Sequence, residues 1–481
     1  MRFKTASLIT VAIAIFFLMC APSCRKTQRV LTTGGVVTFS DDTLSFDTVF
    51  TAAGSFTTGI LIYNKQNEPI TLSTVKLKNG NSSYFHINVD GFTGNVVNNI
   101  NIAAHDSIYV FATVNINPTD TSTPFIVTDE LIATLNGKDF SVPFVAYGQN
   151  AHYIVSDSLS GTNNWLTDKP YVVLHSCVVG PGATLNIPAK CKVYMHQDAR
   201  FFVFGTMNVN PTPVAPADSV VFQGDRLDRD YFGYLGYPGE WGGFYFVTGS
   251  TGTFKKTVIK NCGGGSMYRG FYAQPAAMEV DSGAHVTINS TIIKNSIGYG
   301  ILNWQGNVTA TNTFVGTTGA EALVSLQGGY DSMTNCTFAN YGDVAVSLDH
   351  RSNHTVVLLN YFQVSSTEIY YGALDAVLRN CIVYGSLDSE IICDQVSGTP
   401  ASVRLDHSLL KIGSVDLSFI HISGNIVNQD PLFKNITNND FHLTSSSPAI
   451  SNGAIITAIS ADLDGNSRSG HNDIGCYQYT P

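Results

Sequence analysis

Thr311-Asn312-Thr313-Phe314-Val315 and Thr334-Asn335-Cys336-Thr337-Phe338 repeat one pattern, a polar residue at a bend followed by a β-forming apolar residue. Four further segments carry it: Ile288-Asn289-Ser290-Thr291-Ile292, Leu359-Asn360-Tyr361-Phe362, Arg379-Asn380-Cys381-Ile382-Val383 and Leu405-Asp406-His407-Ser408-Leu409. Their polar members are 23, 23, 25, 20 and 26 residues apart, an interval that suits one coil of a parallel β-helix. Because the segments are rich in Val, Ile, Thr and Phe, an α-helical solenoid is excluded.

The recurrent asparagine has a structural explanation. A sharp bend between two strands favours Asn, one of the few non-glycine residues that adopt left-handed backbone angles. In coils stacked about 4.8 Å apart, its amide can also hydrogen-bond to its equivalents above and below. We therefore expect a structural column along the helix axis, formed by Asn289, Asn312, Asn335, Asn360 and Asn380.

Residues 38–150 show the period-2 alternation of half-buried strands, most clearly in Ile108, Val110, Ala112, Val114 and Ile116. About seven such runs occur, and the others begin near Leu44, Ile60, Ile70, Phe85, Leu131 and Phe140. Asn136-Gly137 between the last two is a strong hairpin signal. The pattern predicts an immunoglobulin-like β-sandwich.

The N-terminus reads as an export signal. Arg2 and Lys4 precede an apolar run of 14 residues, Ala6–Met19, which is too short for a comfortable transmembrane helix. Ala21-Pro22-Ser23-Cys24 then resembles a bacterial lipobox, which implies a signal peptide over 1–23, lipidation of Cys24 and a tether over 24–37. Cys20 is the rival acceptor, but Leu18-Met19 before it lacks the expected small residue. We expect a membrane-anchored protein of the cell envelope, in the outer membrane, with the leaflet left open.

The composition excludes a disordered or nucleic-acid-binding chain, because 44% of residues are hydrophobic and only 13% are charged. Cleavage would remove Arg2 and Lys4 from the 26 basic residues and leave 24 against 36 acidic ones. Seven further cysteines have irregular spacing without a C-x-x-C pair, so we expect buried core residues and no disulfide framework, zinc or other metal site. These are Cys177, Cys191, Cys262, Cys336, Cys381, Cys393 and Cys476.

Several motifs resemble the right-handed β-helix lipoproteins of Bacteroidota-type bacteria, within the pectin-lyase-like superfamily. They are Gly180-Pro181-Gly182-Ala183-Thr184-Leu185, Gly239-Glu240-Trp241-Gly242-Gly243, the repeats above, and the ending Asp430-Pro431-Leu432-Phe433, Asp440-Phe441-His442-Leu443, Ser447-Pro448-Ala449-Ile450 and Asp473-Ile474-Gly475-Cys476-Tyr477. The resemblance covers nearly all of the chain after the signal peptide. It implies an all-β protein, an N-terminal β-sandwich followed by a right-handed single-stranded parallel β-helix over 151–450, with a closing module over 451–481.

Because the superfamily contains polysaccharide lyases and hydrolases, enzymatic motifs need attention. Val346-Ser347-Leu348-Asp349-His350-Arg351 resembles the aspartate-histidine strand of pectate lyases, which makes Asp349, His350, Arg351 and Arg379 the catalytic candidates. A lyase also needs a carboxylate cage for calcium and an arginine base, and no such carboxylate cluster is evident. A solvated polar turn is the alternative interpretation.

Asp462-Leu463-Asp464-Gly465-Asn466 is similar to a calcium loop but lacks its closing glutamate. We expect a turn in which Arg468 or Asp473 bonds to the loop backbone. A structural calcium near Asp462 and Asp464 is the alternative, and no other cofactor is expected.

Two aromatic excursions interrupt the early coils. Residues 225–243 and 263–273 are predicted to stand side by side and to wall a groove for sugar rings. The ligand-binding candidates are Asp228, Arg229, Tyr234, Tyr237, Trp241, Tyr268, Arg269 and Tyr272. The opposing interpretation is that these aromatics pack on the flank of the coil.

Three functions remain open at this point. The first is non-catalytic binding of a glycan or another surface ligand, and the second is a polysaccharide lyase or glycoside hydrolase. The third is a structural or adhesive stalk with protein partners. The expected partners are the membrane, through the lipid anchor, and a polysaccharide, with no nucleic acid; the oligomeric state is open.

Overall fold

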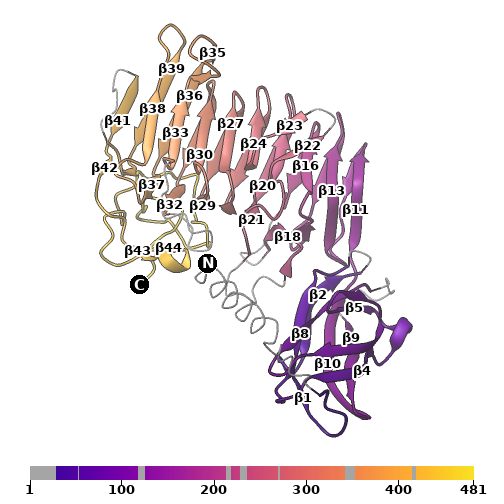
Figure 1. Ribbon diagram of the computed structural model, residues 1–481. Coiled ribbons are helices and arrows are strands. Elements are labelled where there is room, and N and C mark those ends of the chain that lie inside the picture. Colours follow the sequence, from indigo (N-terminus) through magenta and orange to yellow (C-terminus); the bar gives the residue numbers. More distant parts are fainter. Residues whose placement is uncertain are drawn as a thin grey trace, which may run out of the picture. The chain divides into compact units, whose positions relative to one another are not determined.

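The computed structural model describes residues 29–51, 54–116, 125–212, 218–227, 236–268, 271–341, 353–413 and 419–481. Its contacts divide the chain into two compact units: apart from two short segments, one lies before Gly148 and the other is Gly148–Pro481. Nearly all regular structure is β (Figure 1). Among the described residues, no helix is long and apolar enough to cross a membrane.

The first unit is a sandwich of two five-stranded sheets, ordered β1-β3-β8-β5-β6 and β2-β10-β9-β4-β7. The strands of the first sheet pair antiparallel throughout, and so do β9, β4 and β7 of the second. Fully buried Phe46 and Phe144 from one sheet meet Phe85 from the other, with ring centroids 5.5 and 5.6 Å from Phe85. The predicted N-terminal sandwich is therefore confirmed. The strands are β1 (Val37–Phe39), β2 (Leu44–Phe50), β3 (Thr58–Asn64), β4 (Ile70–Leu77), β5 (Phe85–Val89), β6 (Phe92–Thr93), β7 (Val96–Ile102), β8 (Ser107–Val114), β9 (Phe125–Leu135) and β10 (Lys138–Gln149), with a 3-10 turn at Gly80–Ser82.

Two local features of the sandwich decide how well its strands could be predicted. Asn136 and Gly137 have φ of 50° and 82° and join β9 to β10, as a tight hairpin requires. Strand β7 escaped the alternation pattern because Asn99 has a left-handed φ of 57°. Asn98 pairs with Thr74 while Ile100 pairs with Leu72, so the apolar positions on either side of Asn99 fall out of step.

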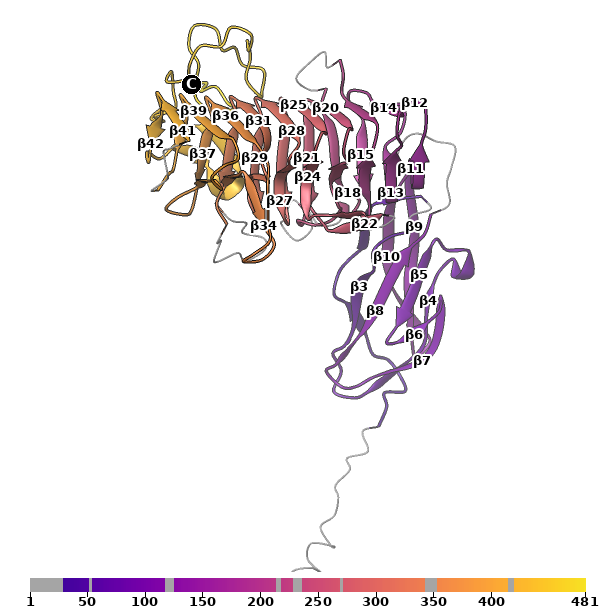
Figure 2. The same ribbon diagram turned by 90° about the horizontal axis from the view of Figure 1, so that it is seen from above.

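The second unit is a parallel β-helix with three faces, visited in the same order by each coil (Figures 1 and 2). The first face contains β15 (Lys192–Met195), β18 (Val220–Gly224), β21 (Thr257–Cys262), β26 (Ile292–Ser296), β29 (Phe314–Thr318), β32 (Thr337–Asn340), β37 (Ile382–Gly385), β40 (Leu409–Leu410) and β42 (Ile426–Val427). The second contains β16 (Arg200–Val203), β19 (Phe244–Phe246), β24 (Ala276–Asp281), β27 (Tyr299–Trp304), β30 (Leu323–Leu326), β33 (Val356–Leu359) and β38 (Ile391–Asp394). Strands β11 (His152–Leu159) and β13 (Tyr171–Val179) begin both faces.

The third face is a separate ten-stranded parallel sheet. Its strands are β12 (Thr162–Asn164), β14 (Thr184–Ile187), β17 (Thr206–Val209), β20 (Thr251–Lys255), β25 (His285–Asn289), β28 (Asn307–Thr311), β31 (Gly329–Thr334), β36 (Leu374–Arg379), β39 (Ala401–Asp406) and β41 (Ile420–Ser423). Three antiparallel hairpins of the described residues stand outside the faces. They are β22 (Ser266–Tyr268) with β23 (Phe271–Ala273), β34 (Tyr361–Gln363) with β35 (Ile369–Tyr371), and β43 (Phe433–Asn435) with β44 (Asp440–Leu443), the last enclosing a 3-10 turn at Ile436–Asn438.

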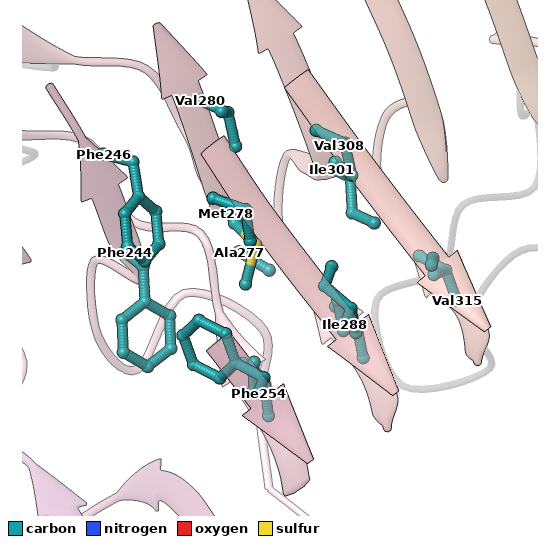
Figure 3. Packing of buried hydrophobic residues seen from close by; sticks show 14 of the residues in the cluster. Phe244, Phe246, Phe254, Ala277, Met278, Val280, Ile288, Ile301, Val308 and Val315 are labelled. Carbon is teal, nitrogen blue, oxygen red and sulfur yellow. The ribbon is translucent and has the colours of Figure 1, made fainter. Parts of the chain in front are cut away.

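The core of the β-helix consists of inward side chains stacked from coil to coil. Phe244, Met278 and Ile301 are register partners on successive strands of the second face and are fully buried (Figure 3). Phe254 and Ile288 stack in the same way on the third face (Figure 3). Each buried side chain of this size contributes roughly 1.5–3 kcal/mol through removal of apolar surface from water.

The bend between the third and first faces carries the predicted polar column, with two corrections. Register partners place Asn312, Asn335 and Asn380 at one position, with left-handed φ of 47°, 50° and 53°. The predicted position of Asn289 is wrong by one residue. Asn289 pairs with Thr311, and Ser290 occupies the bend position. The prediction that Asn360 belongs to this column is also wrong, because Asn360 follows β33 at the end of the second face. The prediction divided one coil of 45 residues, from Asn335 to Asn380, into two.

The amide column is shared with the C-terminal segment. Asn380 Nδ2 donates to Asn335 Oδ1 at 2.8 Å, and Asn380 also exchanges two hydrogen bonds with the backbone of Ala454. Asn312 Nδ2 donates to Ala461 O at 2.7 Å and not to the asparagine of the next coil. Phe441 stacks on Phe314 with centroids 4.7 Å apart. The C-terminal segment therefore packs along this flank of the helix.

These contacts predict a graded response to substitution. Asn380→Ala should lower the free energy of unfolding by about 2–3 kcal/mol, because three side-chain hydrogen bonds are lost, whereas Asn335→Ala should cost about 1 kcal/mol. Exposed Asn289→Ala is the matched control and should change stability by less than about 0.5 kcal/mol. Urea unfolding followed by tryptophan fluorescence measures this, since Trp165, Trp241 and Trp304 all belong to the second unit. Equal costs for Asn289 and Asn380 would contradict the register.

Candidate functional site

The two aromatic excursions do leave neighbouring coils at one bend, between the first and second faces. Gly239 N donates to Cys262 O, Glu240 N to Asn261 O, and Gly264 N to Trp241 O, each at 2.9 Å. The predicted juxtaposition of the excursions is thus present at their bases. Asp228, Arg229, Tyr234 and Arg269 lie outside the described residues, and for Tyr268 only the backbone of β22 is described.

Trp241 does not form a sugar platform at this bend. Its side chain is fully buried and packs on Phe222 and Phe244 with centroids 6.4 and 5.4 Å away, and its indole N–H donates to Lys260 O at 2.9 Å. The prediction for Trp241 is corrected to a core role, because its ring points into the coil. Tyr237 is half-buried, while Tyr272 on β23 remains 59% exposed.

A buried ion pair holds the backbone where both excursions rejoin the coil. Arg200 on β16 is fully buried, and its guanidinium donates to Gly242 O, to Gln274 O at 2.9 Å and to Ala276 O at 3.1 Å. Its counter-ion, Glu279 on β24, accepts from Gln274 N at 2.7 Å. Burial raises the pKa of Glu279 to about 7 and lowers that of Arg200 to about 10. This pair is shielded from solvent, so it positions backbone and offers no surface to a ligand.

The catalytic candidates are not assembled into a site among the described residues. Asp349, His350 and Arg351 lie outside them. Arg379, at the end of β36, donates through Nε to Asp406 Oδ2 at 2.6 Å, and His407 holds the other oxygen at 2.7 Å. Although partial burial opposes it, the His407 and Arg379 contacts keep the pKa of Asp406 below its usual range. Arg379 is therefore paired through its Nε with a carboxylate that His407 also contacts.

The candidate calcium loop is a turn with its oxygens engaged. Asp462 accepts from Asn466 N and from Gln478 N, each at 2.7 Å, and Asp464 Oδ2 contacts His442 Nε2 at 2.8 Å. Arg468 donates to Asp473 O and Gly475 O at 3.0 and 2.8 Å, so it organises this turn through the backbone. Within the described ranges, no three His, Cys, Asp or Glu side chains are grouped to hold a metal ion.

A solvent-accessible site lies on the outer side of the third face, which sequence reasoning missed. Two hollows of about 540 and 380 Å³ both include Asn307 and Tyr330 in their linings. We call the combined feature the axial groove. Its residues are His285, Val286, Thr287, Gln305, Gly306, Asn307, Thr309, Gly329, Tyr330, Ala373, Leu374, Asp375, Pro400, Ala401 and Ser402.

The axial groove runs across coils because its central residues are register partners. His285 pairs with Asn307, Asn307 with Tyr330, Tyr330 with Asp375, and Asp375 with Ser402. Figure 2 shows their strands β25, β28, β31, β36 and β39 side by side along the helix. Since successive strands are about 4.8 Å apart, this column spans about 19 Å. Tyr330, 39% exposed, presents an aromatic ring at its middle.

Glycines allow the coils to pack closely at the bend between the second and third faces, beside the groove. Gly329 has φ of 123°, and a Cβ there would lie 2.9 Å from Asn303 Nδ2. A Cβ on Gly372 would lie 2.4 Å from Gln327 O, and one on Gly306 would lie 2.9 Å from Asp281 O. Close packing against neighbouring coils thus requires glycine at these bend positions, two of which, Gly306 and Gly329, line the groove.

A polar cluster inside the coil supports this bend from beneath. Fully buried Asp331 accepts from Asn303 Nδ2 at 3.0 Å and from Ser325 Oγ at 2.5 Å. Asn303 Oδ1 in turn accepts from Gly306 N at 2.7 Å, which fixes one groove glycine. Burial raises the pKa of Asp331 to about 6. A network of buried, hydrogen-bonded side chains therefore supports the groove at Gly306.

The groove surface combines an aromatic ring with planar and hydroxyl hydrogen-bonding groups. Asn307 Nδ2 donates to His285 Nδ1 at 3.0 Å, and Arg404 donates to Asp375 Oδ1 at 2.8 Å and to Ser402 Oγ at 3.2 Å. Thr287 and Thr309 add hydroxyls from the parallel column. Such a surface can stack on the apolar face of a sugar ring and hydrogen-bond to its hydroxyl groups.

Comparisons with known proteins identify no family. No family model matches the chain, and no curated protein matches it either. Among solved structures, a family 123 glycoside hydrolase from Clostridium perfringens is similar at 10% identity over 23% of this chain and 25% of that chain, with a TM-score of 0.17. The SafA pilin in complex with the SafB chaperone from Salmonella enterica matches at 14% identity over 25% and 57%, with a TM-score of 0.17.

A PapD-like domain of human CEP192 is also similar, at 11% identity over 24% of this chain and 84% of that chain, with a TM-score of 0.16. The chain spans a quarter of the hydrolase and little over half of the pilin structure. Likenesses this slight carry no argument about function. A functional conclusion therefore depends on the geometry of the axial groove itself.

Proposed function

We propose that this chain is an exported lipoprotein of the cell envelope whose β-helix binds a polysaccharide in the axial groove without catalysis. The binding proposal depends on one observation: the exposed ring of Tyr330 lies between two contiguous hollows, in a column of hydrogen-bonding side chains. Aromatic stacking with directed hydrogen bonds from both sides is the usual chemistry of sugar recognition.

The groove is lined by a single carboxylate, which favours binding over hydrolysis. Asp375 is the one carboxylate among the residues that line the two hollows, and it is paired with Arg404. Glycosidases ordinarily use two carboxyl groups that flank the scissile bond. A polysaccharide lyase or hydrolase remains the second candidate through the resemblance to the pectin-lyase-like superfamily. Release of new reducing ends or unsaturated sugars during the binding assays would favour it.

The binding test compares two exposed tyrosines of the same β-helix. Tyr330→Ala should weaken retention in gels containing soluble polysaccharides by about tenfold or more, because a central aromatic anchor is removed. Tyr272→Ala, on the β22–β23 hairpin, is the matched control and should retain binding. Both variants should melt within a few degrees of the wild-type protein, since both rings are exposed. Lost retention in Tyr272→Ala alone would move the site to the aromatic excursions.

The lipid anchor is proposed from the lipobox-like segment that ends in Cys24 and from the resemblance to Bacteroidota-type lipoproteins, which supports an outer-membrane location. Cys24 itself lies outside the described residues. Several acyl chains on one residue would bind a membrane far more firmly than a single chain. Cys24→Ser should therefore abolish acyl labelling and release the protein from the membrane fraction. Loss of labelling in Cys20→Ser with retention in Cys24→Ser would assign the anchor to Cys20.

A further inference from the structure

We infer that the ligand class of the axial groove is a linear, uncharged polysaccharide that lies along the helix axis, and not a uronate polymer. The inference rests on the proposed function and deepens it. Two independent observations support it: the direction in which the groove repeats its contacts, and the pairing of Arg404, the cation beside the groove, with Asp375.

The groove repeats its contacts along the axis. His285, Asn307, Tyr330, Asp375 and Ser402 follow one another on successive strands, so each coil adds one polar or aromatic contact. A second column on the same face adds the hydroxyls of Thr287, Thr309 and Ser332 at the same intervals. Contacts that recur about every 4.8 Å over about 19 Å suit a polymer with repeating hydroxyl groups better than a single sugar.

Lys and Arg side chains are absent from the residues that line the groove, and the cation next to it, Arg404, is paired with a carboxylate. The ten described strands of the third face contain three Lys or Arg side chains. Arg379 pairs with Asp406 at 2.6 Å and Arg404 with Asp375 at 2.8 Å, whereas Lys255 Nζ donates to Pro211 O at 3.0 Å and lies outside the residues that line the two hollows. A bound uronate would need an unpaired guanidinium or ammonium group, or a metal ion, to offset the loss of water around its carboxylate. Hydroxyl groups need only the amide, hydroxyl and backbone partners that the groove provides.

The pair Asp375–Arg404 sets this selectivity. Asp375 lines the groove, and Arg404 projects from the next strand and binds both Asp375 and Ser402. The carboxylate therefore occupies the guanidinium that would otherwise recognise an acidic sugar. Because both side chains are nearly half exposed, the pair contributes little to stability, and its effect falls on recognition.

The test uses the full chain from residue 25 and two groups of probes. Xylan and mixed-linkage β-glucan are the neutral probes; polygalacturonate and alginate are the acidic ones. We expect retention by at least one neutral polymer that changes less than about twofold between 50 and 500 mM NaCl, with no retention by the acidic polymers. Affinity for oligosaccharides of that neutral polymer should rise with chain length over several units. Salt-sensitive preference for the acidic polymers, or full affinity for the monosaccharide, would overturn the inference.

One substitution is expected to produce a gain of binding. Asp375→Asn removes the counter-ion of Arg404 and should produce salt-sensitive retention by polygalacturonate, which Asp375→Asn combined with Arg404→Gln should abolish. If Asp375→Asn gains no acidic ligand while wild-type protein binds a neutral one, the selectivity argument for this pair is wrong. If wild-type protein is retained by none of the four polymers, the proposed function itself fails, and the inference with it. Binding that survives Tyr330→Ala would instead show that the groove is not the site.

Discussion

Arg200→Met is expected to destabilise the β-helix by about 3–5 kcal/mol, the largest effect of any single polar substitution considered for this chain. The methionine can fill part of the space but cannot donate to Gly242 O, Gln274 O and Ala276 O. Above about pH 7, where the Glu279 carboxyl group ionises, it also leaves that group without its counter-ion. Urea unfolding followed by tryptophan fluorescence is the measurement, because all three tryptophans belong to the second unit.

Glu279→Gln is the control for the Arg200 prediction. Burial raises the pKa of Glu279 to about 7, so below that pH its carboxyl group is largely protonated. A glutamine there should cost less than about 1 kcal/mol at pH 6, because it can still accept from Gln274 N. If Glu279→Gln destabilised the protein as much as Arg200→Met at pH 6, charge pairing and not backbone capping would be the source of the stability.

Glu390→Ala is expected to cost about 3 kcal/mol, the next largest effect, because two buried donors and one partly buried donor lose their acceptor. Glu390 is fully buried, and it accepts from Leu387 N at 2.7 Å, Thr355 N at 3.1 Å and Thr355 Oγ1 at 2.6 Å. It thereby closes its own turn and joins it to the neighbouring coil. Exposed Asp388→Ala, two residues away, is the matched control and should change stability by less than about 0.5 kcal/mol. Similar losses in both variants would indicate a general sensitivity of the loop and contradict this account of Glu390.

The architecture of the second unit could be predicted because its local signals agree. Bends that require left-handed angles carry Asn312, Asn335 and Asn380, and each is followed within two residues by a strand of the first face. The predicted register was wrong where an unrelated segment has a similar sequence. Leu359-Asn360 ends a strand of the second face, and it resembles the bend motif only because an apolar strand precedes an asparagine there as well.

The buried polar groups could not be predicted because their partners are distant in sequence. Arg200 meets Gln274 and Glu279, more than 70 residues later, only after two excursions have closed. Trp241 illustrates the complementary difficulty: a tryptophan among charged residues has the composition of a binding loop, yet its indole turns into the core. Composition alone does not say which way a side chain at a bend points.

The sequence pattern of the axial groove is weaker than that of the bends. Outward positions of β25, β28 and β31 alternate with buried ones in His285-Val286-Thr287, Asn307-Val308-Thr309 and Tyr330-Asp331-Ser332. The column then continues at Asp375, 45 residues after Tyr330, because β33 and the β34–β35 hairpin intervene. Only the register of the folded sheet brings Tyr330 and Asp375 onto adjacent strands.

The central claim, that a polysaccharide lies over Tyr330, is tested most directly by Tyr330→Trp. The indole keeps an aromatic face in the groove, so binding of the retained neutral polysaccharide should stay within about threefold of the wild-type affinity. Titration with that polysaccharide should then change the tryptophan emission of the variant, while the wild-type emission, from Trp165, Trp241 and Trp304, stays constant. Undiminished binding with no change in the emission of Tyr330→Trp would place the ligand elsewhere and contradict the account.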